Sequence, residues 1–141
     1  MGLAVGTTHA TLADSAGADA GVTGAVDGAN LPGVPKYNVS FTGQYNFNIS
    51  GDTYGFARGA AHWTGASNGA LDPNNPDYSR PAYDTVDLST GVTWDKWELS
   101  LFVKNLFNND MIIQHPVVQS VSNEAYRIPP RTIGISLSGK L

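Results

Sequence analysis

Residues 37–47 read YNVSFTGQYNF, in which apolar and polar side chains alternate. One set is aromatic, aliphatic or glycine, and the other set is entirely polar. A period of two over this length predicts a β-strand with one apolar and one polar face. The same alternation recurs, with Phe102 as an exception on the polar side, at residues 57–64, 86–94, 98–104 and 132–141, and more weakly at residues 3–8. The sequence therefore predicts an all-β chain.

Strand length separates the membrane β-barrel from other all-β folds. The alternation predicts six strands, and most of them run well past the average of about 5–6 residues in globular proteins. A tilted strand that crosses a bilayer needs about 9–11 residues. We therefore expect an antiparallel transmembrane β-barrel segment rather than a soluble sandwich. The predicted strands lie near residues 2–11, 36–48, 53–65, 82–94, 97–107 and 131–141.

Composition agrees with a barrel wall and excludes several other classes. Only 14% of the residues are charged, against about 25% in soluble domains. The sequence nevertheless has no apolar run of about 18 residues that would make a membrane helix. Cysteine is absent, which excludes a disulfide scaffold and a thiolate metal site, and the net charge of −4 argues against nucleic acid. A secreted soluble β-protein can share this composition and stays open as an alternative.

The predicted connections alternate between short and long. Short ones fall near residues 48–52 and 94–97, and long ones near residues 12–35, 66–81 and 108–130. Outer-membrane barrels have short periplasmic turns and long extracellular loops. Aromatic residues cluster at the two short turns, where an interfacial girdle is expected, although aromatics are also common in ordinary strands. The residues concerned are Tyr45, Phe47, Tyr54, Trp94 and Trp97.

Three motifs carry a resemblance to a known family. They are LPGVPKYN at residues 31–38, WELSLFVKNLFN at residues 97–108 and PRTIGISL at residues 130–137. In order and spacing they resemble the late strands of a TonB-dependent outer-membrane receptor. The resemblance implies that residues 1–141 are a C-terminal segment, the last six strands of a barrel of about 22 strands, with the plug domain absent. The chain ends in Leu141, whereas many outer-membrane proteins end in an aromatic residue.

The resemblance also implies a function, a location and partners. It implies TonB-energised uptake of iron-siderophore complexes or another large nutrient across a Gram-negative outer membrane. The implied partners are outer-membrane lipid, the missing plug and upstream strands, the TonB complex through the missing region, and the barrel-assembly machinery. Residues 1–8 lack the features of a signal peptide, so we expect an N-terminal part to be missing. A passive porin-like channel and a soluble or surface-exposed β-sheet binding domain remain the alternatives.

Candidate binding residues follow from the loops. In the family, ligands contact the extracellular loops, and loops are where binding residues gather. The candidates are Asn68, Asp72, Asn74, Asn75, Asp77, Tyr78, Arg80, Gln114, His115, Gln119, Asn123 and Tyr126. We expect no cofactor and no metal site, because the three histidines fall on different elements and the Asp-Asn cluster at residues 72–77 lacks the glycine and glutamate of a calcium loop. No nucleophile or acid–base motif indicates an enzyme.

Overall fold

The computed structural model describes residues 1–14, 24–76, 78–114 and 126–140, and every regular element in them is a strand. Six strands form the main sheet: β1 (Gly2–Thr7), β2 (Tyr37–Ser50), β3 (Thr53–Thr64), β6 (Tyr83–Trp94), β7 (Trp97–Lys104) and β10 (Thr132–Gly139). Two small hairpins are made by β4 (Ser67–Asn68) with β5 (Ser79–Arg80), and by β8 (Ile112–Gln114) with β9 (Tyr126–Arg127). The described part of the chain contains no helix that could span a membrane.

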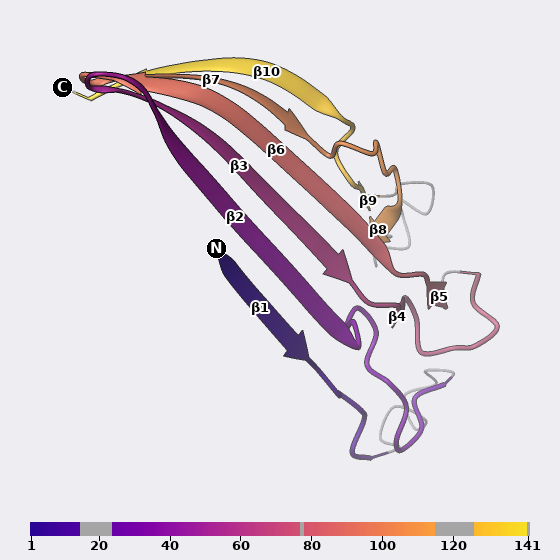
Figure 1. The fold of residues 1–141 in the computed structure, drawn as a ribbon. Helices are drawn as coiled ribbons and strands as arrows, with labels where there is room; N and C mark the ends of the chain where they lie inside the picture. Colours follow the sequence, from indigo (N-terminus) through magenta and orange to yellow (C-terminus); the bar gives the residue numbers. More distant parts are fainter. Residues whose placement is uncertain (15–23, 77, 115–125, 141) are drawn as a thin grey trace.

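The six strands form one antiparallel sheet in the order β1-β2-β3-β6-β7-β10. Each main strand pairs with the next one along the chain, so the sheet is a simple meander. Figure 1 shows the strands side by side in a curved and twisted layer. The sheet is not closed, because β1 pairs only with β2 and β10 pairs only with β7. The predicted all-β, six-stranded antiparallel architecture of a barrel segment is therefore confirmed.

Three strands are shorter than the sequence predicts. β2, β3 and β6 have 14, 12 and 12 residues, whereas β1, β7 and β10 have 6, 8 and 8. β7 ends at Lys104 because Asn105 takes a left-handed conformation with φ of 50°. β10 begins at Thr132, because the backbone N–H of Arg131 donates to Oδ1 of Asn108 instead of to a neighbouring strand. The expected ranges 2–11, 97–107 and 131–141 were therefore too long.

The strand register gives the sheet two faces of different character. The polar face carries residues such as Gln44, Arg58, Ser89 and Glu98, which lie on one side by alternation and pairing. The other side, the apolar face, carries Leu3, Val5, Val39, Phe41, Tyr45, Phe47, Trp63, Val86, Leu88, Val92, Trp94, Trp97, Leu99, Leu101, Val103, Ile133, Ile135 and Leu137. The predicted division of these strands into two faces is confirmed.

The apolar face is not buried against a second layer. Ile135 is 74% exposed and Leu101 is 51% exposed. Among the described residues, the buried apolar ones are only Ala25, Phe56 and Ile128. A soluble sandwich would bury one face of each sheet in a core. A single layer with a continuous exposed apolar face instead has the character of a wall that meets hydrocarbon on that side.

Aromatic rings lie over glycines of the neighbouring strand. Phe56 is directly opposite Gly91, and Phe102 is directly opposite Gly134. A Cβ atom on Gly91 would lie 2.7 Å from Cζ of Phe56, and one on Gly134 would lie 2.5 Å from Cζ of Phe102. Each ring therefore covers the backbone of a residue without a side chain, as in the pairing known as aromatic rescue. This pairing accounts for Phe102, which interrupts the polar alternation.

We predict that Gly91→Ala destabilises the sheet by about 1–3 kcal/mol, as overpacking does elsewhere. The new methyl group would collide with the carbonyl oxygen of Leu99 and with the ring of Phe56. Gly43→Ala is the matched control, because its nearest atom is Cε1 of Phe41 at 3.8 Å. The measurement is urea unfolding of a full-length receptor carrying each substitution. Equal losses at the two glycines would contradict the close packing of Phe56 on β6.

Candidate ligand-binding site

The long connections gather at one end of the sheet, here called the loop end. Residues 8–36, 65–82 and 105–131 connect the strands there, and Figure 1 shows both small hairpins at this end. The opposite end, called the turn end, has two-residue connections at 51–52 and 95–96. Gly51 and Asp95 take positive φ values of 52° and 46°, which tight turns between twisted strands require. The predicted alternation of short and long connections is confirmed.

Aromatic residues mark the turn end. Trp94 and Trp97 pair directly across the turn between β6 and β7. Tyr45 and Phe47 stack on β2 with ring centroids 6.0 Å apart. These four residues lie on the apolar face. Tyr54 differs, because its pairing with Asn48 and Thr93 places it on the polar face. The predicted clustering of all five aromatics at the short turns is present, but Tyr54 lies on the opposite face from the other four.

Several candidate residues make hydrogen bonds within the first small hairpin, which consists of β4, β5 and the turn between them. Asp72 Oδ1 accepts hydrogen bonds from the backbone N and from Nδ2 of Asn74, at 2.9 and 3.2 Å. The backbone of Asn75 donates to Asp72, and that of Tyr78 donates to Asn75. Beyond this turn, Asn68 in β4 faces β5 across the hairpin, which ends at Arg80. The structure thus brings these candidates together in one turn that they themselves stabilise.

The second hairpin holds two further candidates in its backbone. Gln114 in β8 pairs with Tyr126 in β9. The remaining candidates, Asp77, His115, Gln119 and Asn123, lie outside the described residues.

His62 lies in β3, where its Nδ1 is 3.0 Å from Oγ of Ser40. In the ranges that the structure describes, no three His, Asp or Glu side chains come together as they would around a metal ion.

The two hairpins touch through Arg80. Its Nη1 donates a hydrogen bond of 3.2 Å to the carbonyl oxygen of Ile113 in β8. Arg80 lines a cavity of about 340 Å³ between the hairpins, and Arg127 of β9 lines the same cavity. Arg127 Nη1 donates to the carbonyl oxygen of Asp110 at 3.0 Å and lies 3.7 Å from Oδ2 of that residue.

Sequence reasoning missed Arg127. It is a single cation in a long loop, and nothing in its neighbours along the chain marks it as part of a site. Only the pairing of Ile112 with Arg127 brings it to the cavity that Arg80 lines. Its ion pair with Asp110 is an exposed one, with the two side chains 56% and 88% accessible, and such pairs contribute little to stability. The cavity therefore joins one predicted residue to one that the sequence did not indicate.

Asn105 fastens the base of the second loop. It is 5% exposed, and its Nδ2 donates to the carbonyl oxygens of Asn109 and Pro129, both at 2.8 Å. Its backbone N donates to Asp87 Oδ1 at 2.9 Å. Asn108 also has a positive φ, 55°, and accepts from the backbone of Arg131. The hydrogen bonds of the two asparagines therefore hold the loop to Asp87 of β6 and to Arg131, which directly precedes β10.

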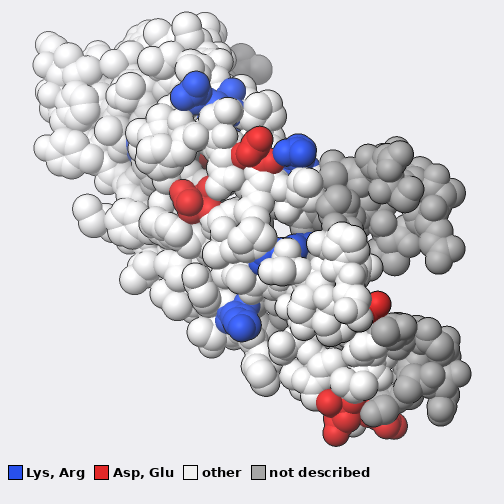
Figure 2. Space-filling model, turned by 90° about the vertical axis from the view of Figure 1, so that its right-hand side faces the viewer, with Lys and Arg blue, Asp and Glu red and all other residues white. Residues whose placement is uncertain are grey.

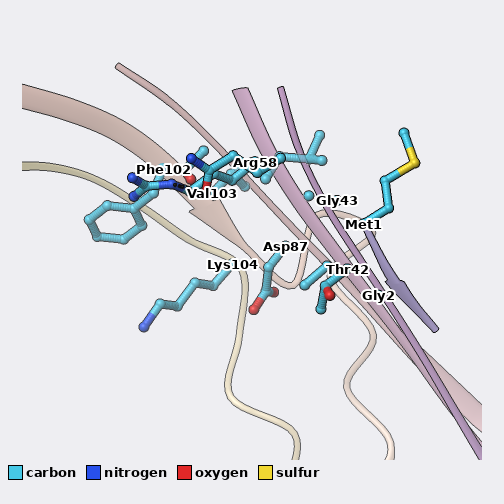
Figure 3. Close-up of a pocket in the computed structure, with 14 residues that line it drawn as sticks. Met1, Gly2, Thr42, Gly43, Arg58, Asp87, Phe102, Val103 and Lys104 are labelled. Carbon is cyan, nitrogen blue, oxygen red and sulfur yellow. Dashed lines mark hydrogen bonds between the residues drawn. The ribbon is translucent and has the colours of Figure 1, made fainter. Parts of the chain in front are cut away.

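The polar face carries a second group of charges. Arg58 makes two hydrogen bonds to the carboxylate of Glu98, at 3.1 and 3.2 Å, and its Nε donates to Gln44. Its guanidinium lies 3.9 Å from the centre of the Phe56 ring. A hollow of about 590 Å³ lies beside it, and Figure 3 shows Asp87 and Lys104 among the side chains that line this hollow. Figure 2 shows basic and acidic side chains spread over the face in view, with several acidic ones together at its lower end.

Comparison with known proteins agrees with this architecture. The family described as "TonB dependent receptor-like, beta-barrel" matches residues 2–106, which include β1 to β7 and the second motif as far as Leu106. Searches of curated proteins and of solved structures each gave no match. The matched region covers most of the chain and includes five of the six strands of the main sheet, with β10 outside it. The chain therefore belongs to the TonB-dependent receptor family, as a segment of its β-barrel.

Proposed function

We propose that residues 1–141 form the C-terminal part of the barrel wall of an outer-membrane receptor that takes up an iron-siderophore complex or another large nutrient with energy from TonB. The family is one of outer-membrane receptors and transporters, not of enzymes. The observation that carries the proposal is the family match over residues 2–106 on a single sheet with one apolar and one polar face. A plug domain, upstream strands and assembly machinery would complete the receptor.

The two faces support a wall between lipid and an aqueous lumen. The apolar face suits outer-membrane lipid, because its alternating residues form a continuous hydrocarbon surface. The polar face suits the lumen, since Arg58, Glu98, Asp87 and Lys104 project from it. The four aromatics at the turn end suit a membrane interface. In this arrangement the loop end, with its two hairpins and the cavity between them, faces the ligand.

Uptake tests the energised function. Cells that make the full-length receptor containing these strands should take up its radiolabelled ligand. This uptake should stop when the proton-motive force is collapsed or TonB is deleted. Uptake that continues under both conditions would favour a passive porin-like channel. A polypeptide that purifies without detergent and transports nothing would favour the soluble β-sheet binding domain.

Cysteine labelling tests the orientation. We predict that a cysteine at Asn74, in the first hairpin of the loop end, reacts with an impermeant thiol reagent on intact cells. A cysteine at Lys96, in a turn at the opposite end, should react only after the outer membrane is opened. Lys96 is preferred to Asp95 because the positive φ of Asp95 disfavours substitution. The sequence has no native cysteine, so the background from these strands is nil. The reverse labelling pattern would invert the proposed topology.

A further inference from the structure

We propose that Arg80 and Arg127 together bind an anionic group of the ligand, a carboxylate or a phosphate, at the loop end of the sheet. This inference rests on the proposed receptor function and specifies the chemistry of its ligand. Neither arginine belongs to a main strand of the wall, and each is brought to the site by a two-residue strand of a small hairpin.

The geometry places both guanidinium groups at one cavity. Arg80 is anchored on the carbonyl oxygen of Ile113, and Arg127 is anchored on that of Asp110, so one short segment fixes both side chains. Both line the same cavity of about 340 Å³. A guanidinium carries five N–H donors in a rigid fork. A hydrogen bond from Nη1 to a backbone carbonyl therefore orients each guanidinium. The N–H groups that it does not use remain able to bind an anion in a bidentate manner.

The charge and the walls of the cavity favour an anion with an organic body. Among the described residues that line it, two arginines face one carboxylate, that of Asp110. This carboxylate is 88% exposed and lies 3.7 Å from Arg127, which makes it a weak competitor for the guanidinium. Pro76, Pro81, Met111 and Ile112 supply apolar walls. The combination of apolar walls with a few convergent polar groups is typical of ligand pockets.

The position of Arg80 points to a ligand at the mouth of the lumen rather than to a lipid phosphate. Arg80 also lines an adjoining cavity of about 220 Å³, together with Asn38, Thr64 and Tyr83. The register pairs Asn38 with Thr64 and Thr64 with Tyr83, which places all three on the polar face. Lipid would contact the apolar face. Arg80 thus links the proposed anion cavity to residues of the polar face, which favours a ligand on the inner side of the wall over a lipid phosphate.

Binding of free anions by the full-length receptor in detergent tests the proposal. The probes are tricarballylate and inorganic phosphate, with neutral trimethyl tricarballylate as the uncharged comparison, titrated by calorimetry. Arg80→Gln and Arg127→Gln should each weaken tricarballylate binding roughly ten- to hundredfold, as expected for lost hydrogen bonds to a charged group. Arg131→Gln is the matched control. It removes an exposed arginine that contacts the carbonyl oxygen of Leu106 and lines neither cavity.

Each outcome decides the matter. Weaker binding in the two variants, with wild-type affinity in Arg131→Gln and no binding of the neutral ester, supports the site. Equal affinity in all four proteins, no anion binding by the wild type, or equal binding of the ester overturns it. If the two substitutions weaken only the binding of added lipopolysaccharide, and not that of the free anions, the arginines bind lipid and the proposal is overturned. The wild-type comparison of acid with ester holds even if a variant fails to fold. A receptor whose uptake still depends on TonB after such a result would keep the proposed function without this site.

Discussion

Leu101→Arg is expected to destabilise a full-length receptor carrying these strands by about 2–4 kcal/mol if the residue lies near the bilayer midplane, whereas Ser100→Arg should be tolerated. Leu101 lies on the apolar face, directly between Thr90 of β6 and Ile135 of β10. A guanidinium there would be placed in hydrocarbon. Ser100 lies on the polar face, and its direct partners Gly91 and Ser136 are small, so an arginine there can extend into the aqueous lumen.

The comparison of these two adjacent residues isolates the facing of the strand. Both are in β7, both receive the same side chain, and they differ in the side of the sheet to which they point. The measurement is urea unfolding of the receptor refolded into phospholipid vesicles, followed by tryptophan fluorescence. Losses of similar size at both positions would mean that the apolar face does not meet lipid.

The sequence predicted the main sheet because the information lies in its alternation. The strands β2 and β6 have 14 and 12 residues, long enough for a period of two to be evident. The alternation along a strand determines which residues share a face of the sheet. Where the alternation is interrupted, prediction was less accurate. Phe102 breaks the pattern because a ring is needed over Gly134. The end of β7 was misplaced because the left-handed turn at Asn105 carries no periodic signal.

The candidate site was less predictable for a physical reason. The hairpins β4–β5 and β8–β9 contain strands of two or three residues, which are too short to show any period. Their composition indicated only loops, so Arg80 was one polar loop residue among many. Its relation to Arg127 depends on non-local pairing and on hydrogen bonds to the backbone of residues 110 and 113. Such contacts cannot be obtained from the order of residues in one loop.

The isolated 141-residue polypeptide is expected to show no stable single-channel conductance in a planar bilayer and no uptake of any ligand. Its sheet has two free edges, one on β1 and one on β10. In a bilayer each unsatisfied backbone group costs several kcal/mol, so an open edge is not viable there. In water the same edges, beside an exposed apolar face, favour aggregation. We therefore expect inclusion bodies or detergent-dependent oligomers.

Closure within one copy of the chain cannot remove these edges. Closed bacterial barrels begin at about eight strands, and even an eight-stranded barrel has an interior only wide enough for side chains. The main sheet has six strands, and its polar face carries large groups such as Phe56, Arg58 and Phe102, which would not fit inside a narrower cylinder. The partners that β1 and β10 require are therefore other strands, which we expect to be those upstream in the same receptor.

Heat-modifiable gel migration provides the comparison that decides this point. The same strands joined to their upstream sequence should migrate as a compact species before heating and as an extended one afterwards, because a closed barrel resists the detergent until it unfolds. The 141-residue chain should show a single, extended migration. A monodisperse monomer of this chain with reproducible conductance would show that six strands close on themselves. That result would replace the receptor-wall proposal with a small, complete barrel.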